Sequence, residues 1–477
     1  MSEVTPARRA ARRRTRRPAR TVLVGLAALA ALVTSSCQGD AGTPDDPAAP
    51  TAPSSRAAAG TASDPVELTF AVFGPDAEST SFQRVVDQFN AQVSSTQVSL
   101  ETFPDRRALL DELATGATPP DVYLASRRDL DQIVAEGLNT PLLELLDERG
   151  VDYGDDYSRD ALLSFSTEDD LQCMPYGLAP EVVFYNTDLI DFDRMRARGL
   201  PAPSSTLRGW SFASFAAAAD VATRPRRGTR GVFVPPTLRG LAPFVYSGNG
   251  SLFDDESDPT SLVLSEDGSR DALTQALGLL RNPLLTLDES QTGRRAAMQA
   301  FEDGRLGMIT GTRSLTPRLR RVPGLRFDAM PMPVIGDQVT VGDITGLCIG
   351  ADEPELGRTA DFLVRLISAP AVAQVAREGY LVPANLTVAL SPDFLQPGQM
   401  PANANIFNTS VRDLEVTPLI DRGTPLEEAV RTQVRELFTA PLLDDLDART
   451  EQIDETSRSV LDPDYVPEGS ASPTPSD

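Results

Sequence analysis

The stretch that decides the fold is Glu67-Leu-Thr-Phe-Ala-Val-Phe73, followed by Phe82, Val85, Val86 and Phe89. The first seven residues alternate in polarity and then become continuously apolar, which is the pattern of a β-strand that enters a core. The four apolar residues that follow recur at i, i+3, i+4 and i+7, so they share one face of an α-helix. The folded part of the chain therefore begins with a strand and then a helix.

The same alternation continues along the chain. It predicts strands at Gln97–Phe103 and Asp121–Ala125 and helices at 105–115 and 127–136. Strands that alternate with helices predict an α/β fold with a parallel sheet covered on both faces. Ligands of such sheets bind beyond the carboxyl ends of the strands. The candidate ligand-binding residues of this part are therefore Phe73, Asp76, Ser126 and Arg127.

A second region, 182–345, carries further signals of both kinds. We expect strands at Gly231–Val234 and Arg305–Thr310 and a helix at Ala272–Leu280. A long helical zone from Leu426 to Ser457 is expected near the end of the chain. The length of 477 residues suits two or three domains.

The first 36 residues have the organisation of a targeting segment. Eight arginines lie between Arg8 and Arg20, and an apolar run of 14 residues follows at Thr21–Thr34. That run is too short to span a bilayer, which takes about 20 residues. Small residues and then Cys37 come next, and this order resembles a bacterial lipoprotein signal whose cysteine becomes the lipidated first residue. The alternative is a simple secretion signal with an incidental cysteine.

Two segments outside the folded part are expected to be disordered. Residues 37–65 consist mostly of Ala, Pro, Thr, Ser, Gly and Asp and have no apolar period, which is typical of a tether. Residues 461–477 have a similar composition and form the expected tail. The lipid on Cys37 would hold the protein on the outer face of the cell membrane.

The composition excludes several kinds of chemistry. The chain has no histidine, and all 44 of its basic residues are arginine. It therefore has no imidazole base, no Ser-His-Asp triad and no lysine for a Schiff base. Its net charge of −24 argues against nucleic acid as a partner. We expect no catalytic residue, metal or cofactor; the competing class is a carboxylate enzyme such as a glycosidase.

Five motifs in order resemble the extracytoplasmic solute-binding proteins of ABC importers (family 1), which include maltose-binding protein. The most specific is Met174-Pro-Tyr-Gly-Leu-Ala-Pro-Glu-Val-Val-Phe-Tyr-Asn186-Thr-Asp-Leu189, an apolar strand that ends in Tyr-Asn before Asp-Leu. The others are Gly116–Val122 with Pro-Asp, Gly209–Phe215 led by Trp210, Phe301–Gly311 and Gly379–Asn385.

The resemblance implies a type II periplasmic-binding-protein fold, in which two α/β lobes are joined by crossing strands and hold the ligand between them. The crossings would fall near Pro175–Phe184 and Gly346–Gly350. The lobes would be 66–178 with 349–395, and 182–345 with 396–460. The implied function is to bind a small solute, a sugar or sugar derivative, by hinged closure and to deliver it as a monomer to ABC permease subunits. The alternative is a sensor or cell-envelope binding protein on the same fold.

Several residues of the second region are candidates for the ligand site. Glu181 lies at a crossing, where it would bond sugar hydroxyls or form an interlobe ion pair. Phe244, Tyr246 and Asn249 combine rings with polar groups as a pocket wall does, although Phe244 also suits the core. Arg313 stands where the resemblance places a ring-stacking tryptophan; it is either a partner for an anionic ligand or a surface arginine.

The remaining cysteines and the single tryptophan complete the expectations. With Cys37 lipidated, Cys173 and Cys348 are the two cysteines left, and an oxidising exterior favours their pairing. By resemblance both lie at the lobe crossings on adjacent segments, so we expect a disulfide there. The alternative is two separate buried thiols. The resemblance gives Trp210 a role in packing.

Overall fold

The computed structural model describes residues 64–115, 119–167, 170–287, 293–420, 424–439 and 445–466. They belong to one compact unit, Ala62–Asp477. The expected signal segment, Cys37 and most of the tether and tail lie outside the described residues. Within these residues no single helix is long and apolar enough to cross a membrane; only the bent pair Leu356–Ile367 and Ala369–Ala376 reaches that length and composition together.

The first sheet contains the strand–helix alternation seen in the sequence. Its strands are β1 (Val66–Phe73), β2 (Thr96–Phe103), β3 (Val122–Ser126), β4 (Asn139–Thr140), β7 (Met174–Leu178), β13 (Ile344–Gly350) and β14 (Val382–Pro383). The order is β14-β7-β13-β3-β1-β2, with β4 beside β13. β1 runs parallel to β2 and β3, as expected. β13 runs antiparallel to β3 and β7, so the expectation of a purely parallel sheet is only partly correct.

The antiparallel direction of β13 has a simple topological cause. β13 arrives directly from the second sheet, without the long crossover connection that a parallel neighbour needs. β7, which follows the hairpin of β5 (Ser166–Thr167) and β6 (Asp170–Leu171), is antiparallel to β13 and therefore runs in the same direction as β3. The sequence periodicity shows the strands but not these connections.

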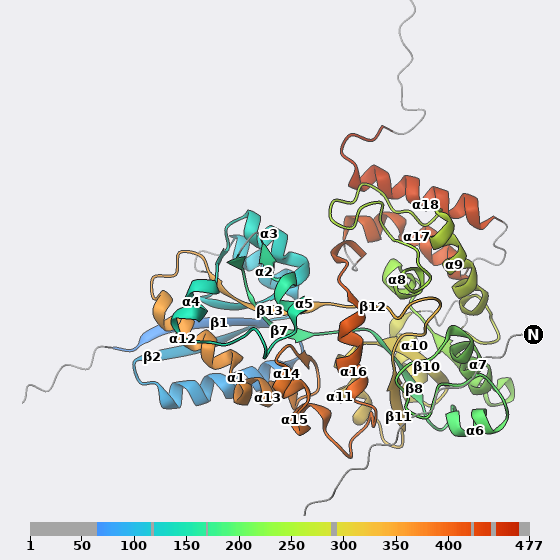
Figure 1. Cartoon of the computed structure of the whole chain (residues 1–477), viewed down its shortest axis with the longest axis horizontal. Coiled ribbons are helices and arrows are strands. Elements are labelled where there is room, and N and C mark those ends of the chain that lie inside the picture. The colour runs from blue at the N-terminus through green and yellow to red at the C-terminus, as the bar shows by residue number, and fades with distance from the viewer. Residues whose placement is uncertain are drawn as a thin grey trace, which may run out of the picture. The chain divides into compact units, whose positions relative to one another are not determined.

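Helices cover both faces of the first sheet. They are α1 (Asp76–Gln92), α2 (Arg106–Thr115), α3 (Leu130–Ala135), α4 (Leu143–Glu148), α5 (Arg159–Ser164), α12 (Leu356–Ile367), α13 (Ala369–Ala376), α14 (Leu386–Ala389) and α15 (Pro392–Leu395). In Figure 1, α2 and α3 lie on one side of the strands and α1 and α13 on the other. The predicted apolar face of α1 is buried. The ring centroid of Phe362 lies 5.7 Å from that of Phe70 and 5.0 Å from that of Phe89, so α12 closes the same core.

The second sheet has four strands in the order β11-β8-β10-β9. They are β8 (Val182–Asn186), β9 (Arg230–Phe233), β10 (Leu306–Gly311) and β11 (Phe327–Met330). β9 and β10 are parallel, whereas β8 is antiparallel to its neighbours β10 and β11. Buried Trp210 donates its indole N–H to the carbonyl of Pro331 at 2.8 Å and packs edge-on against Phe215. Its expected packing role is confirmed.

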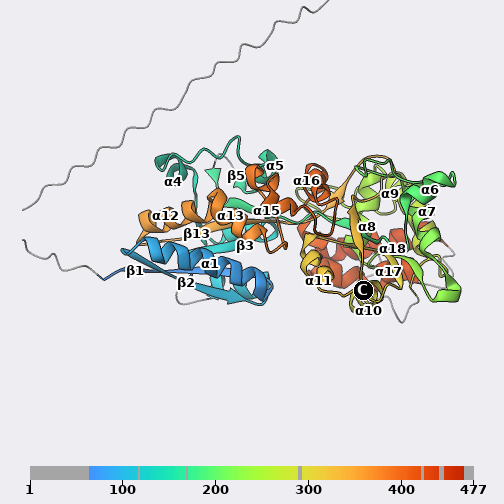
Figure 2. The same cartoon turned by 90° about the horizontal axis from the view of Figure 1, so that it is seen from below.

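Helices from two distant parts of the chain surround the second sheet. They are α6 (Phe192–Ala197), α7 (Phe212–Ala222), α8 (Leu238–Ser247), α9 (Asp267–Leu280), α10 (Arg294–Glu302), α11 (Thr316–Arg320), α16 (Asn405–Ser410), α17 (Pro425–Thr439) and α18 (Leu446–Leu461). The expected helical zone at the end is thus two helices, which lie with α8 in both views (Figures 1 and 2). The carboxylate of Asp454 in α18 accepts the backbone N–H groups of Leu264 and Ser265, both at 2.9 Å, and fastens this helix to the lobe.

Short connections join the two sheets. The chain leaves β7 and enters β8 through 179–181, where the resemblance placed a crossing. It returns through 331–343, which includes β12 (Thr340–Val341), and β12 pairs with β15 (Leu414–Glu415). Gly346–Gly350, expected in this crossing, lies instead inside β13 of the first sheet. The sequence resemblance predicts a strand at Gly346–Gly350. Its pairing with β3 and β7 in the structure shows that this strand belongs to the first sheet and not to a crossing.

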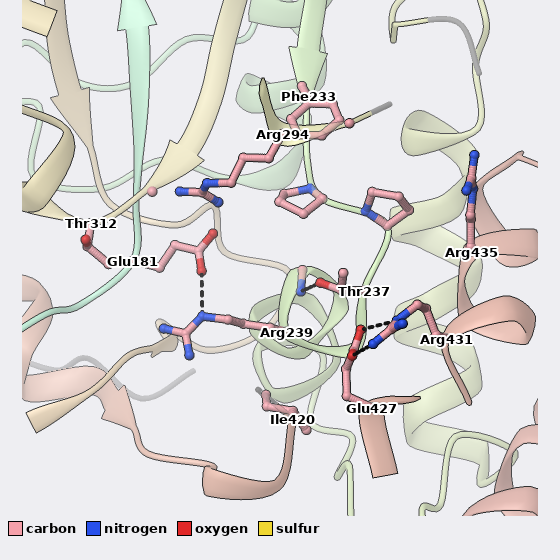
Figure 3. A pocket seen from close by; sticks show the side chains of 15 residues that line it. Glu181, Phe233, Thr237, Arg239, Arg294, Thr312, Ile420, Glu427, Arg431 and Arg435 are labelled. Atoms are coloured by element: carbon pink, nitrogen blue, oxygen red, sulfur yellow. Dashed lines mark hydrogen bonds and ion pairs between the residues drawn. The ribbon is translucent and has the colours of Figure 1, made fainter. Parts of the chain in front are cut away.

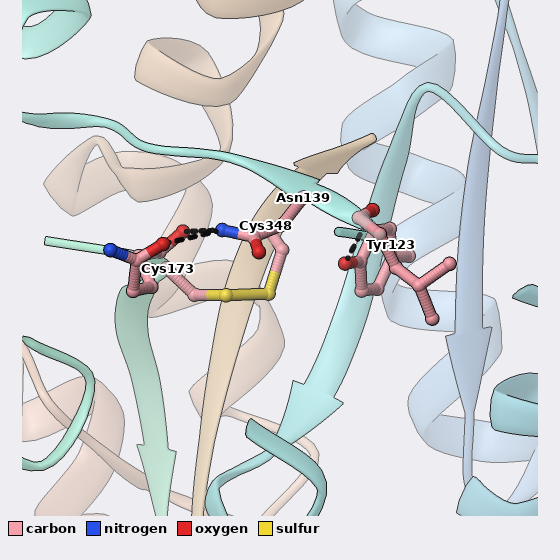
Figure 4. Close-up of a disulfide and its surroundings, with 6 residues drawn as sticks. Tyr123, Asn139, Cys173 and Cys348 are labelled. Atoms are coloured by element: carbon pink, nitrogen blue, oxygen red, sulfur yellow. Dashed lines mark hydrogen bonds between the residues drawn. A yellow bond between two sulfur atoms is a disulfide. The ribbon is translucent and has the colours of Figure 1, made fainter. Parts of the chain in front are cut away.

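A disulfide joins Cys173 and Cys348, with Cα atoms 4.4 Å apart (Figure 4). Cys173 directly precedes β7, and Cys348 lies in the adjacent antiparallel β13, so the two residues face each other across a strand pair. Both cysteines are fully buried. The bridge was expected at the lobe junction, but both of its strands belong to the first sheet. The disulfide therefore cross-links two segments of one lobe and does not link the two lobes at the hinge.

Candidate functional site

A cavity of about 560 Å³ lies at the carboxyl ends of the parallel strands β9 and β10 (Figure 3). This is the edge at which α/β sheets bind ligands. The volume is that of a small-molecule site. The lining residues come from the first crossing, the ends of β9 and β10, the loop after β9, the starts of α8 and α10, η6 (Pro418–Ile420) and α17. They are Glu181, Phe233, Pro235, Pro236, Thr237, Arg239, Gly240, Gly293, Arg294, Gly311, Thr312, Ile420, Glu427, Arg431 and Arg435.

Glu181 is held in the cavity wall by both segments that connect the sheets. Its backbone N–H donates to the carbonyl of Val341 at 2.9 Å, and its own carbonyl accepts the hydroxyl of Thr340 at 2.6 Å. The residue is only 5% exposed, and its carboxylate Oε2 lies 3.8 Å from Nε of Arg239. Arg239 belongs to α8, which packs on the same sheet that Glu181 enters. The carboxylate is thus placed at the crossing as predicted, with a partner from the second lobe.

The loop after β9 brings the start of α8 to the cavity. The hydroxyl of Thr237 caps this helix by accepting the N–H of Gly240 at 3.1 Å. A Cβ atom on Gly240 would fall 2.0 Å from the carbonyl oxygen of Pro235, so only glycine fits this close turn. The rings of Pro235 and Pro236 give the lining an apolar surface beside polar side chains, which is a common composition of ligand sites.

The opposite wall is formed by α17. The carboxylate of Glu427, only 3% exposed, accepts Nη2 of Arg431 at 2.8 Å and Nε at 3.4 Å (Figure 3). Arg431 also donates to Glu428 at 3.2 Å. These hydrogen bonds raise the pKa of Arg431, so its guanidinium stays charged. Among the described residues, no group of three or more His, Cys, Asp or Glu side chains is arranged to hold a metal ion.

The candidate residues of the first lobe gather at the ends of β1 and β3 but do not line this cavity. Phe73 is partly buried and Asp76 is exposed. Buried Ser126 donates its hydroxyl to both carboxylate oxygens of Asp343 at 3.0 Å, beside the second crossing. Arg127, 3.4 Å from Asp131, lines a separate hollow of about 250 Å³. These residues thus lie at the strand ends, as the sequence predicts. The hydroxyl of Ser126, however, is hydrogen-bonded to Asp343 and not directed to the cavity.

The carboxyl end of β3 nevertheless approaches the cavity wall. The 3₁₀ turn that follows it, η1 (Arg127–Asp129), contacts η6 (Pro418–Ile420), and Ile420 lines the cavity. Arg128 in the same turn donates to the carbonyl of Gly342 at 3.0 Å and lies 3.6 Å from Asp343. These contacts connect the first lobe to the second crossing and bring it beside η6, whose Ile420 lines the cavity.

Three candidate residues lie in or just after the carboxyl-terminal half of α8, whereas the cavity is at the amino-terminal end of this helix. Phe244 is fully buried against Phe212, so its core alternative is correct. The hydroxyl of Tyr246 donates to Glu256 at 3.0 Å; burial and the charge of Glu256 raise the pKa of this tyrosine. Asn249 is exposed just beyond the helix. A helix of ten residues is about 15 Å long, which separates this end from the cavity at its start.

Arg313 is placed in the interior and not in the cavity. Its side chain is 0% exposed, with the guanidinium carbon 3.9 Å from the ring centroid of Phe394 and 5.3 Å from that of Phe407. Nη2 donates to the carbonyl of Phe394 at 2.7 Å. Burial, with a smaller contribution from Arg320, lowers the pKa of Arg313 to about 9. The predicted ligand contact is wrong in this structure, because the turn after β10 directs the side chain under α15 and α16.

We therefore expect substitutions of Arg313 to change stability and not solute affinity. Arg313→Ala should lower the free energy of unfolding by about 2 kcal/mol, because it leaves a cavity beside the two rings. Arg313→Met fills the space without burying a charge and should cost less than the alanine variant. Urea unfolding of both variants gives the comparison. Equal losses for Met and Ala would show that the charge, and not the packing, stabilises this position.

Sequence patterns did not reveal Glu78, which lies at the carboxyl end of β1. It stands in the first turn of α1, with Oε2 only 3.3 Å from where a Cβ of Gly74 would lie. Burial raises the pKa of Glu78 to about 7. The hydroxyl of Tyr176, which has no hydrogen-bond partner among the described residues, interacts electrostatically with it. The sequence pattern predicted Phe73 and Asp76 at this strand end but did not extend to Glu78, two residues further along the chain.

Arg239, Arg294, Glu427 and Arg431 were also missed by sequence reasoning. The carboxyl-end rule that selected Phe73 also applies to the residues after the predicted strand Gly231–Val234, and would have led to the start of α8. The pair Glu427 and Arg431 is recognisable as an i, i+4 ion pair on a helix. No local signal, however, places that helix beside α8 at the cavity.

Several solved structures are similar to this chain. The ABC substrate-binding protein Lmo0181 of Listeria monocytogenes, in complex with cycloalternan, is 15% identical over 83% of this chain and 99% of that one, with a TM-score of 0.69. The GacH receptor of Streptomyces glaucescens, solved unliganded and with acarbose, is 19% identical over 84% and 100%, at 0.66. Maltose-bound MalE3 of T. maritima is 15% identical over 83% and 100%, at 0.65. This likeness shows the two-lobed maltose-binding-protein type of fold.

The sequence itself matches one family model. No curated protein matches the chain significantly. The model for bacterial extracellular solute-binding proteins matches residues 84–402, about two thirds of the chain, and this range includes the second sheet, the first sheet except β1, and both connections between them. The chain therefore belongs to the family of bacterial extracellular solute-binding proteins.

Proposed function

We propose that this protein binds a sugar or sugar derivative outside the membrane and delivers it to the permease subunits of an ABC importer. The observation that carries the proposal is the cavity at the carboxyl ends of β9 and β10, with the carboxylate of Glu181 in its wall at the crossing. The similar structures were solved with cycloalternan, acarbose and maltose, which supports a carbohydrate as the solute. The protein acts as a monomer and turns nothing over.

Closure about the connections 179–181 and 331–343 would bring the strand ends of the first lobe, with Phe73, Asp76 and Arg127, toward the cavity. Solute binding then favours the closed form, which the permease recognises. The domain limits follow: one lobe ends near 178 and resumes at β13, and the other occupies most of 182–343 and the final helices. Small-angle scattering with and without solute measures this change as a decrease in the radius of gyration.

The test is calorimetric titration of the purified chain with a panel of mono- and oligosaccharides. At least one should bind, and Glu181→Gln should weaken its binding by roughly 10- to 100-fold, the range for a lost hydrogen bond to a charged group. Glu101→Gln, on an exposed position of β2, is the matched control and should bind like the wild type. Release of product from any glycoside would instead favour the enzyme alternative.

We also propose that Cys37 carries the lipid anchor. Cys37→Ala should move the protein from the membrane fraction to the medium, because a diacylglycerol and a further acyl chain together give stable anchoring whereas none remains in the variant. Immunoblotting of the two fractions gives the result. A variant that stays in the membrane fraction would contradict the anchor at Cys37.

A further inference from the structure

Most of the charged side chains that line the cavity are positive, whereas the whole protein is strongly negative. Among the described residues, four arginines (Arg239, Arg294, Arg431 and Arg435) and two carboxylates (Glu181 and Glu427) line it. These lining side chains therefore include more positive than negative charges, while the chain carries a net charge of −24. In so acidic a protein, a local excess of arginine around one cavity indicates a site for negative charge.

The two carboxylates are already occupied by two of these arginines. Glu181 faces Arg239 at 3.8 Å, and Glu427 holds Arg431 through two hydrogen bonds of 2.8 and 3.4 Å. The side chain of Arg294 extends from the start of α10 toward the side of the cavity where Glu181 and Thr312 lie (Figure 3). Its guanidinium presents a planar fork that matches a carboxylate or phosphate.

Two helix starts add to this positive potential. α8 and α10 both begin at the cavity, and their N-cap residues Thr237 and Gly293 line it. The amino-terminal end of a helix carries a partial positive charge and unpaired N–H groups. The side chain of Thr237 caps α8, whereas no side chain of the described residues caps the first turn of α10. The start of α10 therefore lies next to Arg294 with donors suited to an anion.

The other walls suit a sugar ring. Phe233, Pro235, Pro236 and Ile420 provide apolar surface, and Thr312 and Glu181 provide hydrogen-bonding groups. We infer that the solute is an anionic carbohydrate whose carboxylate or phosphate lies at Arg294 and the start of α10, with its ring against the proline wall. This inference rests on the proposed function and narrows its solute to an acidic class.

The experiment is calorimetric titration of the full chain with matched probes: glucose, glucuronate and glucose 6-phosphate, then maltose and maltobionate, and finally inorganic phosphate alone. An acidic member should bind at least about tenfold more tightly than its neutral partner, a difference typical of one charged hydrogen bond. Glucuronate and maltobionate against glucose 6-phosphate distinguish a carboxylate from a phosphate. Raising the salt concentration should reduce the preference, because salt screens an open ion pair.

Arg294→Gln should remove the preference for the acidic member while leaving the thermal midpoint unchanged. Arg295→Gln, the adjacent exposed arginine of α10 that does not line the cavity, should retain the preference. A neutral sugar that binds as tightly as its acidic partner would overturn this inference and leave the proposed function standing. Binding of inorganic phosphate but of no sugar would overturn the proposed function instead. If no probe binds at millimolar concentration, both are contradicted.

Discussion

Replacing Cys173 and Cys348 together by alanine should lower the free energy of unfolding by about 3 to 5 kcal/mol. The bond links residues 175 apart in the sequence, and closing so long a loop removes much conformational entropy from the unfolded chain. Both residues are fully buried at the base of the first sheet, so the change also removes packed sulfur atoms from the core. Because both strands belong to one lobe, solute affinity should change little.

Urea unfolding of the variant against the wild type measures this loss. Wild-type protein unfolded in the presence of a reductant is the matched control and should approach the midpoint of the variant. Thiol counting on the denatured, unreduced mature protein, in which the proposed lipid occupies the sulfur of Cys37, is an independent check and should detect no free thiol. Two free thiols, or a variant midpoint equal to that of the wild type, would show that the bridge does not form.

The second large effect is a loss of stability with rising pH that is caused by Glu78. Its pKa is raised from 4.5 to about 7 by burial, so the folded state holds a proton that the unfolded state releases. Stability from this group is therefore fully present below about pH 4.5 and is lost as the pH rises through about 7. A shift of this size corresponds to roughly 3 kcal/mol. Glu78→Gln, which stays neutral, should raise stability above pH 7 by a similar amount.

The measurement is urea unfolding of wild type and Glu78→Gln from pH 4 to pH 8. The two curves of stability against pH should meet near pH 4 and separate by pH 8. Asp76→Asn removes an exposed carboxylate from the same helical turn, so it controls for the loss of a negative charge near a helix start. A variant with the same pH dependence as the wild type would show that Glu78 is not the cause.

Short-range patterns predicted most of the regular structure. The spacing of Phe82, Val85, Val86 and Phe89 fixed a helix face that is fully packed in the structure, because 3.6-residue periodicity depends only on neighbours along the chain. Motif order predicted the two lobes and the crossing before β8. The direction of β13 could not be predicted in this way, because pairing direction depends on the path of the chain between the sheets.

The ligand site shows the same division. Glu181 could be selected because a crossing segment and a carboxylate are both visible in the sequence. The assignments of Arg313 and Phe244 failed because whether a side chain enters a cavity or the core depends on the direction of a single turn or helix face. Exposure is set by elements far away in the chain, such as α15 and α16 over Arg313.

The sequence by itself determined the α/β class, the two-lobed fold and the family, because these follow from local periodicity and from motifs in a fixed order. Only the tertiary structure decided which charges share a cavity. Glu181, Arg294 and Arg431 lie on three segments separated by more than a hundred residues, and they meet because α10 packs on β10 while α17 packs against α8 at the same cavity. Electrostatic interaction depends on distance in space and not on distance along the chain, so the character of the site emerges only when the chain is folded.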